Sequence, residues 1–224
     1  MTTRQSLSAK ENIASTTKPF NNYLVYIWTA LYLEDELADF KKSILKIADK
    51  YQIRCPLTIV PVHLSLKISF DIKDKMTDKC IQEICRYFYG QAPFYFEPES
   101  YEIYPGILWL KVKDNDKLKE LHAGLDEIVK KFFGVQPSDL DNKFKYHLTI
   151  YTDTDKKLEK GLEELSRIEL PQKVKASNFI VGTSENGRPD TFSVYKQACL
   201  GPEVSIKEEW KEFEGNRPKI AEVT

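Results

Sequence analysis

The chain has 224 residues, of which 33 are Lys or Arg and 34 are Asp or Glu, so its formal net charge is -1, and 42% of its residues are apolar. This apolar fraction excludes a disordered chain, and the balanced charge excludes a protein that coats nucleic acid through its electrostatic field alone. The length predicts one domain with its own core, because domains usually have roughly 100–200 residues.

The N-terminal region and the cysteines indicate the compartment. The first 20 residues are polar and rich in Ser and Thr, with no apolar segment of the kind found in secretory signals. The four cysteines, Cys55, Cys80, Cys85 and Cys199, include no CxxC pair and no zinc-binding spacing with histidine. We therefore expect a cytoplasmic monomer with reduced, mostly buried thiols, no metal or other cofactor, and no membrane partner.

Apolar periodicity predicts the elements in chain order. The expected strands cover residues 23–28, 57–70, 94–96, 101–104, 107–112, 144–151, 174–182 and 191–200, with a turn at Asn186-Gly187. The expected helices cover residues 34–50, 77–89, 116–133 and 155–168. Residues 1–20 are expected to form a flexible tail, 21–200 the domain, and 201–224 a second tail or a short docked helix. Each half of the sequence thus carries two helices and a set of strands, which predicts an α+β fold with an internal quasi-repeat.

Two of the three histidines share one local pattern. His63-Leu64-Ser65-Leu66 and His147-Leu148-Thr149-Ile150 both read histidine, apolar, hydroxyl, apolar. Residues i and i+2 of a strand point to the same face, so each histidine should share a face with its hydroxyl while the apolar residues pack underneath. The third histidine, His122, lacks a hydroxyl at +2 and is expected to be a packed helix residue.

This pattern suits acid–base chemistry on a phosphodiester. Breaking a P–O bond needs a base for the attacking oxygen and an acid for the departing one, and imidazole can serve as either near neutral pH. The hydroxyls of Ser65 and Thr149 can donate hydrogen bonds to the non-bridging oxygens, where negative charge must be held. The sequence places no carboxylate cluster beside these histidines that would bind a metal ion.

The paired motifs and the order of elements resemble the two-histidine (2H) phosphoesterase superfamily, and most closely its 2'-5' RNA ligase-like branch of RNA 2',3'-cyclic phosphodiesterases. The resemblance implies a bilobal α+β fold, in which two pseudo-symmetric lobes of antiparallel sheet with outer helices surround a central cleft. It implies metal-independent hydrolysis, with His63 as proton donor, His147 as proton acceptor, and Ser65 and Thr149 holding the phosphate. The implied partners are RNA 3' ends or small nucleotides.

One position departs from this branch, many of whose members have an arginine five residues after the second histidine. Thr152 stands there in this chain, so the arginine's phosphate contact is either missing or supplied by another group. By strand parity, Lys67 shares the face of His63, while Lys145 and Tyr151 share the face of His147, and these three are further candidates for substrate contacts.

The sequence is also compatible with other functions. The same chemistry could act on 2'-5' oligoadenylates or on cyclic oligonucleotide messengers. The fold could also serve as a non-catalytic module that binds RNA ends or nucleotides, or as a structural scaffold.

Overall fold

The computed structural model describes residues 24–186 and 191–201. The expected N-terminal tail, the expected C-terminal tail or docked helix from residue 202 onward, and Gly187 of the expected turn lie outside these residues.

The elements largely follow the periodicity of the sequence. The strands are β1 (Leu24–Tyr32), β2 (His63–Lys73), β3 (Phe94–Phe96), β4 (Pro98–Tyr104), β5 (Ile107–Val112), β6 (His147–Thr152), β7 (Val174–Ala176), β8 (Asn178–Ser184) and β9 (Ser193–Cys199). The helices are α1 (Ala38–Tyr51), α2 (Thr77–Tyr89), α3 (Asp116–Phe133), α4 (Asp139–Asn142) and α5 (Asp155–Leu165), with short 3-10 turns at Pro56–Thr58 and Asp74–Met76. The expected strand over 57–70 therefore begins only at His63, and α4 is an element that the periodicity did not predict.

Helix α3 shows how the sequence specifies a helix and its ends. Its buried residues include Leu118, Leu121, Leu125 and Val129, whose spacing of three and four places them on one face. The side chain of Asn115 accepts a hydrogen bond from the backbone N–H of Leu118 and so caps the first turn. Gly134 follows the last turn with a φ of 72°, in the left-handed region that glycine adopts without strain.

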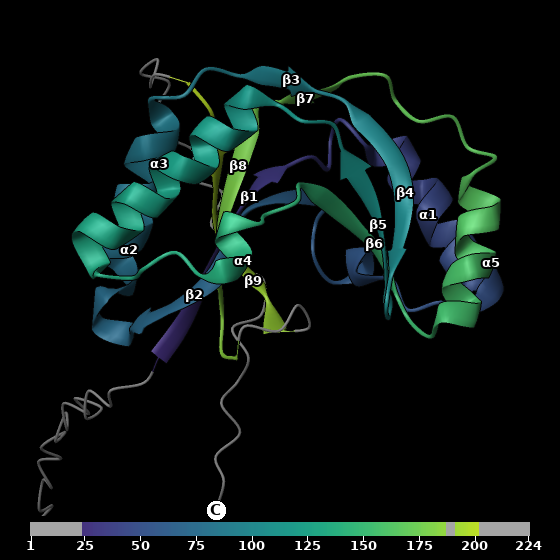
Figure 1. Cartoon of the computed structure of the whole chain (residues 1–224), viewed down its shortest axis with the longest axis horizontal. Coiled ribbons are helices and arrows are strands. Elements are labelled where there is room, and N and C mark those ends of the chain that lie inside the picture. The colour runs from purple at the N-terminus through teal and green to yellow at the C-terminus, as the bar shows by residue number, and fades with distance from the viewer. Residues whose placement is uncertain (1–23, 187–190, 202–224) are drawn as a thin grey trace, which may run out of the picture.

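The strands form two larger sheets and a short connecting ribbon (Figure 1). The first sheet has the strand order β2-β1-β8-β9 and the second β4-β5-β6, and all their paired strands are antiparallel. Helices α2 and α3 cover the first sheet, whereas α1 and α5 lie beside the second. Strands β3 and β7 pair above them.

The two lobes do not coincide with the two halves of the sequence. Helix α1 follows β1 of the first sheet but packs against α5 in the second lobe, and α3 follows β5 of the second sheet but packs on β2. Strands β8 and β9, near the end of the described chain, return to the first sheet. The expected strand over 174–182 is therefore two strands, because β7 pairs with β3 while β8 pairs with β1.

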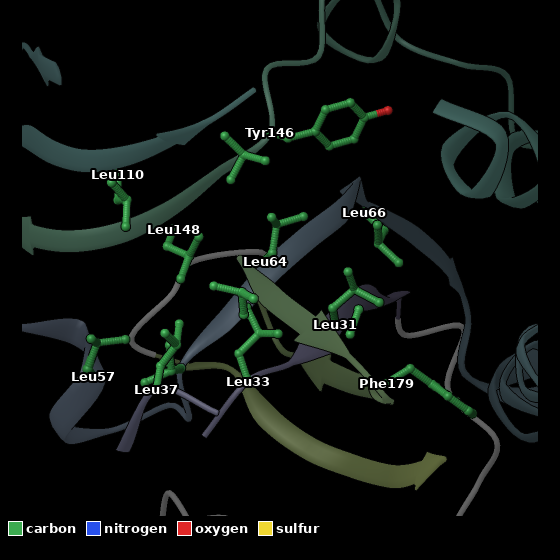
Figure 2. Close-up of a cluster of buried hydrophobic side chains, with 14 of the residues drawn as sticks. Leu31, Leu33, Leu37, Leu57, Leu64, Leu66, Leu110, Tyr146, Leu148 and Phe179 are labelled. Atoms are coloured by element: carbon green, nitrogen blue, oxygen red, sulfur yellow. The ribbon is translucent and has the colours of Figure 1, made fainter. Parts of the chain in front are cut away.

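One hydrophobic cluster joins both lobes (Figure 2). It contains Leu64 and Leu66 of β2 together with Leu110 of β5 and Leu148 of β6, each at most 1% exposed. The apolar residues of the two motifs thus meet in a shared core, so the positions of the motif strands are linked by packing. A smaller cluster of Trp28, Ala30, Tyr32 and Ile180 lies apart from this core.

Two expectations about the chain as a whole also concern the fold. All four cysteines carry free thiols, and Cys199 is the exposed one. Among residues 24–186 and 191–201, no helix has both the length and the apolar character needed to cross a membrane.

Candidate active site

The two motif histidines occupy equivalent positions. His63 is the first residue of β2 and His147 the first residue of β6. The Nδ1 atom of each ring lies within hydrogen-bond distance of the carbonyl oxygen two residues earlier, at 2.8 Å from Pro61 and 2.7 Å from Lys145. A carbonyl oxygen only accepts, so Nδ1 carries a proton in both rings. Each Nε2 is therefore the nitrogen left to exchange a proton: it can accept one when the ring is neutral and donate one when the ring is an imidazolium.

The hydroxyl residues follow the histidines with the period of a strand. Ser65 and Thr149 are half-buried, as His63 and His147 are, whereas the intervening Leu64 and Leu148 are buried. This alternation places each histidine and its hydroxyl on the face opposite the apolar core.

A β-bulge interrupts β2 immediately after the first motif. Ala30 of β1 lies opposite Ser65, and Thr29 lies opposite Lys67, so Leu66 is an extra residue in the ladder. An extra residue reverses the alternation of faces beyond it. Leu66 and Lys67 are accordingly both buried, although they are neighbours in sequence.

The second motif has a bulge at the equivalent position. Trp109 of β5 lies opposite Thr149, and Leu108 lies opposite Tyr151, which leaves Ile150 as the extra residue. In both motifs the side chains thus alternate regularly between the two faces of the sheet from the histidine to the hydroxyl. The extra residue that follows the hydroxyl then shifts this alternation. Parity predictions at +4 from either histidine are therefore wrong, for one shared physical reason.

Lys67 is the first of these corrections. Its side chain is not on the face of His63: the residue is 3% exposed, and its Nζ atom lies 2.5 Å from Asp126 Oδ1 and 3.1 Å from Asp141 Oδ1. These carboxylates belong to α3 and α4. Lys67 is thus committed to a buried ion-pair network and is not a substrate contact.

Tyr151 is the second correction. Its side chain is fully buried, and its hydroxyl donates a hydrogen bond of 2.8 Å to the carbonyl oxygen of Ile44 in α1. Burial raises its pKa well above the usual value of tyrosine. It ties the second sheet to α1 instead of stacking on a base.

Lys145 stays beside the second histidine. It is exposed, its Nζ atom donates a hydrogen bond of 2.7 Å to the hydroxyl of Tyr104, and it lies 5.2 Å from the centre of that ring. The hydrogen bond to Tyr104 raises the pKa of Lys145. Tyr104 in turn lies 4.2 Å from the ring of Trp109, centre to centre, so Lys145 is held at the border of the candidate site.

Each histidine packs against a tryptophan that the sequence pattern did not assign to the site. The ring centre of Trp28 in β1 lies 5.3 Å from His63, and that of Trp109 in β5 lies 4.0 Å from His147. Both come from the strand beside the motif strand. The register of β1 against β2, and no local sequence pattern, places Trp28 on the face of His63.

A further cation, Lys111 in β5, lies directly opposite His147 in the register of the second sheet. Directly paired residues of antiparallel strands share a face, so Lys111 borders the candidate site. Its Nζ atom lies 3.0 Å from Glu99 and its side chain is 38% exposed. The alternation in Ile107-Leu-Trp-Leu-Lys-Val112 contained this signal, since Trp109 and Lys111 are two residues apart, but the partner strand was unknown.

The two imidazoles influence each other's protonation. Burial lowers the pKa of His63, and it is also the main cause of the lowered pKa of His147. The hydrogen bonds to the backbone carbonyls oppose this effect, while the charge of His63 lowers the pKa of His147 further. Protonation of one histidine therefore disfavours protonation of the other, which suits a site that needs one acid and one base.

A separate group of possible metal ligands lies beneath the first sheet. One atom from each of His122, Asp126 and Asp141 lies within 4.8 Å of the others. The ammonium group of Lys67 pairs with both carboxylates, so positive charge is already supplied there. His122 is 8% exposed, and its Nδ1 atom lies 2.8 Å from the carbonyl oxygen of Leu66, which fits a packed helix residue. We interpret this group as part of the buried ion-pair network.

Two antiparallel sheets that each present a histidine and a hydroxyl define a phosphoesterase-type fold and site. The chain belongs to the 2'-5' RNA ligase superfamily, the family of two-histidine phosphoesterases, whose sequence model matches residues 35–188. This membership confirms the predicted resemblance and carries a phosphoesterase-type function with it. A search of curated proteins found no significant match.

Solved structures confirm the predicted fold. E. coli LigT complexed with 3'-AMP superposes with a TM-score of 0.53 at 16% identity, covering 80% of this chain and 98% of that one. A structure described as a phosphoesterase gives a TM-score of 0.56 at 15% identity, covering 78% and 97%. TT0787 of Thermus thermophilus gives 0.52 at 17% identity, again covering 78% and 97%. At this identity the likeness concerns the fold alone.

Proposed function

We propose that the protein is a metal-independent phosphodiesterase that opens 2',3'-cyclic phosphates at RNA or nucleotide ends to 2'-phosphates. One observation carries the proposal. His63 and His147, on two different sheets, have the same Nδ1-protonated form, and their charges interact. A single phosphate bound between two such rings meets one acid and one base.

In this mechanism His147 is neutral and His63 is protonated. Nε2 of His147 takes a proton from a water molecule as its oxygen attacks phosphorus. The bond between phosphorus and the 3'-oxygen breaks, and Nε2–H of His63 donates its proton to that oxygen. The products are a 2'-phosphate and a 3'-hydroxyl, and each histidine ends in the protonation state opposite to the one in which it began.

Other side chains stabilise the charge that gathers on the phosphate. The hydroxyls of Ser65 and Thr149 donate hydrogen bonds to the non-bridging oxygens. Lys111 and Lys145 lie on the side of His147 and are the candidates to supply the positive charge that the branch's arginine supplies in other members. The anionic phosphate itself raises the pKa of the imidazole beside it, which restores the protonated state of His63 on binding.

The solved relatives support a nucleotide substrate. E. coli LigT has been solved in complexes with 3'-AMP, with phosphate and with ATP. These ligands share the phosphate group that the proposed site of this chain is suited to hold.

The experiment is a turnover assay on 2',3'-cyclic nucleotides and on a short RNA ending in a 2',3'-cyclic phosphate, with EDTA present. The expected product carries a 2'-phosphate, and the rate is unchanged by EDTA. Loss of turnover in EDTA would show that the metal-free mechanism is wrong. If turnover is found only with 2'-5' oligoadenylates or cyclic oligonucleotides, the two-histidine chemistry stands but the proposed substrate is wrong.

Variants separate catalysis from binding. His63→Ala and His147→Ala should each lose about 100- to 10,000-fold in rate while nucleotide binding survives. His122→Gln is the matched control, because it changes the third histidine, and its rate per folded molecule should stay near wild type. A wild-type rate in either motif variant contradicts the acid–base assignment. Nucleotide binding without turnover in the wild-type protein would indicate a binding module.

A further inference from the structure

A pocket of about 250 Å³ lies at the end of the first sheet where β1 stops and β2 starts. It is lined by Tyr32, Glu34, Lys41, residues 57–61, Val194 and Gln197. The proposed chemistry uses none of these side chains, so the pocket is available for another part of a ligand.

The pocket adjoins the first histidine. Pro61 lines it, and the carbonyl oxygen of Pro61 is the partner of His63 Nδ1 at 2.8 Å. Tyr32, which also lines it, lies directly opposite His63 in the ladder between β1 and β2. Opposed residues of antiparallel strands share a face, so the pocket opens on the side of the sheet that carries the imidazole.

Gln197 lies on the same face. In the ladder across the first sheet, Ser65 pairs with Ala30, Ala30 with Ile180, and Ile180 with Gln197. This single row connects the hydroxyl of the first motif, on β2, to the glutamine on β9. A ligand whose phosphate lies between the motifs can therefore extend along this face toward Gln197.

The polar groups of the pocket are paired, with one exception. Glu34 accepts from Lys41 at 2.6 Å and, through its other oxygen, from the backbone N–H of Val62 at 2.8 Å. The amide of Gln197 interacts with the hydroxyl of Tyr32. Within the described part of the chain, however, Gln197 Oε1 is buried without a hydrogen-bond partner. A buried acceptor without a donor lowers the stability of the fold by about 1–3 kcal/mol, because its lost hydration is not replaced.

The chemistry of the pocket selects a class of ligand. The charges of Glu34 and Lys41 cancel, so the pocket does not favour a second phosphate. Val60, Pro61 and Val194 supply apolar surface suited to a flat ring. The unsatisfied oxygen of Gln197 is covered in this structure, so a ligand reaches it only when the side chain of this pocket-lining residue turns toward the pocket. A glutamine amide turned in this way pairs well with the amino group of adenine.

We propose that this pocket is the base subsite of the enzyme, and that Gln197 Oε1 accepts a hydrogen bond from the exocyclic amino group of adenine. The proposal rests on the proposed function, since it assigns the base of the same nucleotide whose phosphate lies between the histidines. It predicts a preference for adenosine over uridine ends, because uracil has a carbonyl oxygen where adenine has its amino group.

The test compares 2',3'-cyclic AMP with 2',3'-cyclic UMP in wild type, Gln197→Leu and Gln197→Glu. Gln197→Leu should raise KM for the adenosine substrate roughly tenfold, leave KM for the uridine substrate nearly unchanged, and leave kcat unchanged. Gln197→Glu retains an acceptor oxygen and should keep the preference for adenosine. Gln172→Leu is the matched control, because Gln172 is an exposed glutamine before β7 and outside the pocket.

Equal effects of Gln197→Leu on both substrates, or no effect on either, would overturn the base subsite even if the enzyme is active. Binding of adenosine and uridine 2'-monophosphates, measured by calorimetry, separates this outcome from failure of the proposed function. If the wild type hydrolyses neither cyclic substrate but binds the adenosine monophosphate more tightly, and Gln197→Leu removes that difference, the subsite stands and the proposed activity fails.

Discussion

Replacing Lys67 with methionine tests whether this residue is structural, as the bulge in β2 implies, or a substrate contact. The Lys67 side chain is 2% exposed, and those of its partners Asp126 and Asp141 are 17% and 4% exposed. Burial alone would raise the pKa of Asp141, but hydrogen bonds from Ser138 and the interaction with Lys67 outweigh it, so that pKa lies below its usual value. Methionine keeps most of the side-chain volume and removes the charge.

The variant leaves two carboxylates beneath the sheet without their shared cation. Removing one partner of a buried ion pair costs about 3–5 kcal/mol. In a domain of this size, each kcal/mol of unfolding free energy that is lost lowers Tm by about 2–4 °C. Lys67→Met should therefore lower Tm by roughly 6–20 °C. The matched control is Lys113→Met, because Lys113 pairs with Glu97 at 2.8 Å while its side chain is 57% exposed. An exposed pair contributes about 0–1 kcal/mol, so this control should unfold close to the wild-type temperature.

Thermal unfolding followed by circular dichroism measures both variants, and the turnover assay is run well below the lower Tm. The folded Lys67→Met protein should keep the wild-type KM, because the buried ammonium group of Lys67 is held by Asp126 and Asp141. The reasoning is refuted if Lys67→Met unfolds together with the Lys113→Met control. It is equally refuted if the variant is stable and its KM rises strongly, since Lys67 would then bind substrate after all.

Three further predictions concern the site and its support. Tyr151→Phe removes the hydrogen bond from the tyrosine hydroxyl to the carbonyl of Ile44, which keeps its place inside helix α1, and should cost about 0.5–1.5 kcal/mol of unfolding free energy in urea titrations, with kcat unchanged; a large loss of kcat at full stability would place Tyr151 in the site. Because the pKa values of His63 and His147 are both lowered, kcat/KM of the wild type should peak below pH 6.5, and a maximum above pH 7 would contradict the two-histidine scheme. In His63→Gln the positive charge that disfavours protonation of His147 is gone, so an NMR titration should show a raised pKa for His147; an unchanged value would mean that the imidazoles do not interact.

The bulges also bear on how the site is built. In the proposed mechanism, each motif needs regular strand geometry from the histidine to the hydroxyl, so that both side chains can reach the same phosphate. Beyond the hydroxyl, the next residues of both strands are buried. The extra residues Leu66 and Ile150 make this possible, because they shift the alternation so that the following side chain, Lys67 or Tyr151, turns away from the site. The repeat of this device in both sheets indicates that the two motif strands are alike in backbone geometry as well as in sequence pattern.

The sequence by itself determined the local elements and the two motifs. The bounds of α2, α3 and β5 match those expected from periodicity, because a helix face or a strand face reflects burial within one short segment. The placement of His63 and Ser65 on one face, and of His147 and Thr149 on one face, is equally local, since it depends only on the two-residue period of a strand. The family could be recognised from these motifs, as its sequence model confirms.

Only the tertiary structure decided which strands pair and in which register. The bulges that bury Lys67 and Tyr151 exist only in relation to β1 and β5, and the positions of Lys111 and Gln197 follow from strands that pair across the sheet. Such pairings join residues far apart in the chain, and they are fixed by packing of the whole core, so no local pattern encodes them. For this protein, the sequence specified which groups we propose to do the chemistry, and the fold specified which other groups lie around the proposed site.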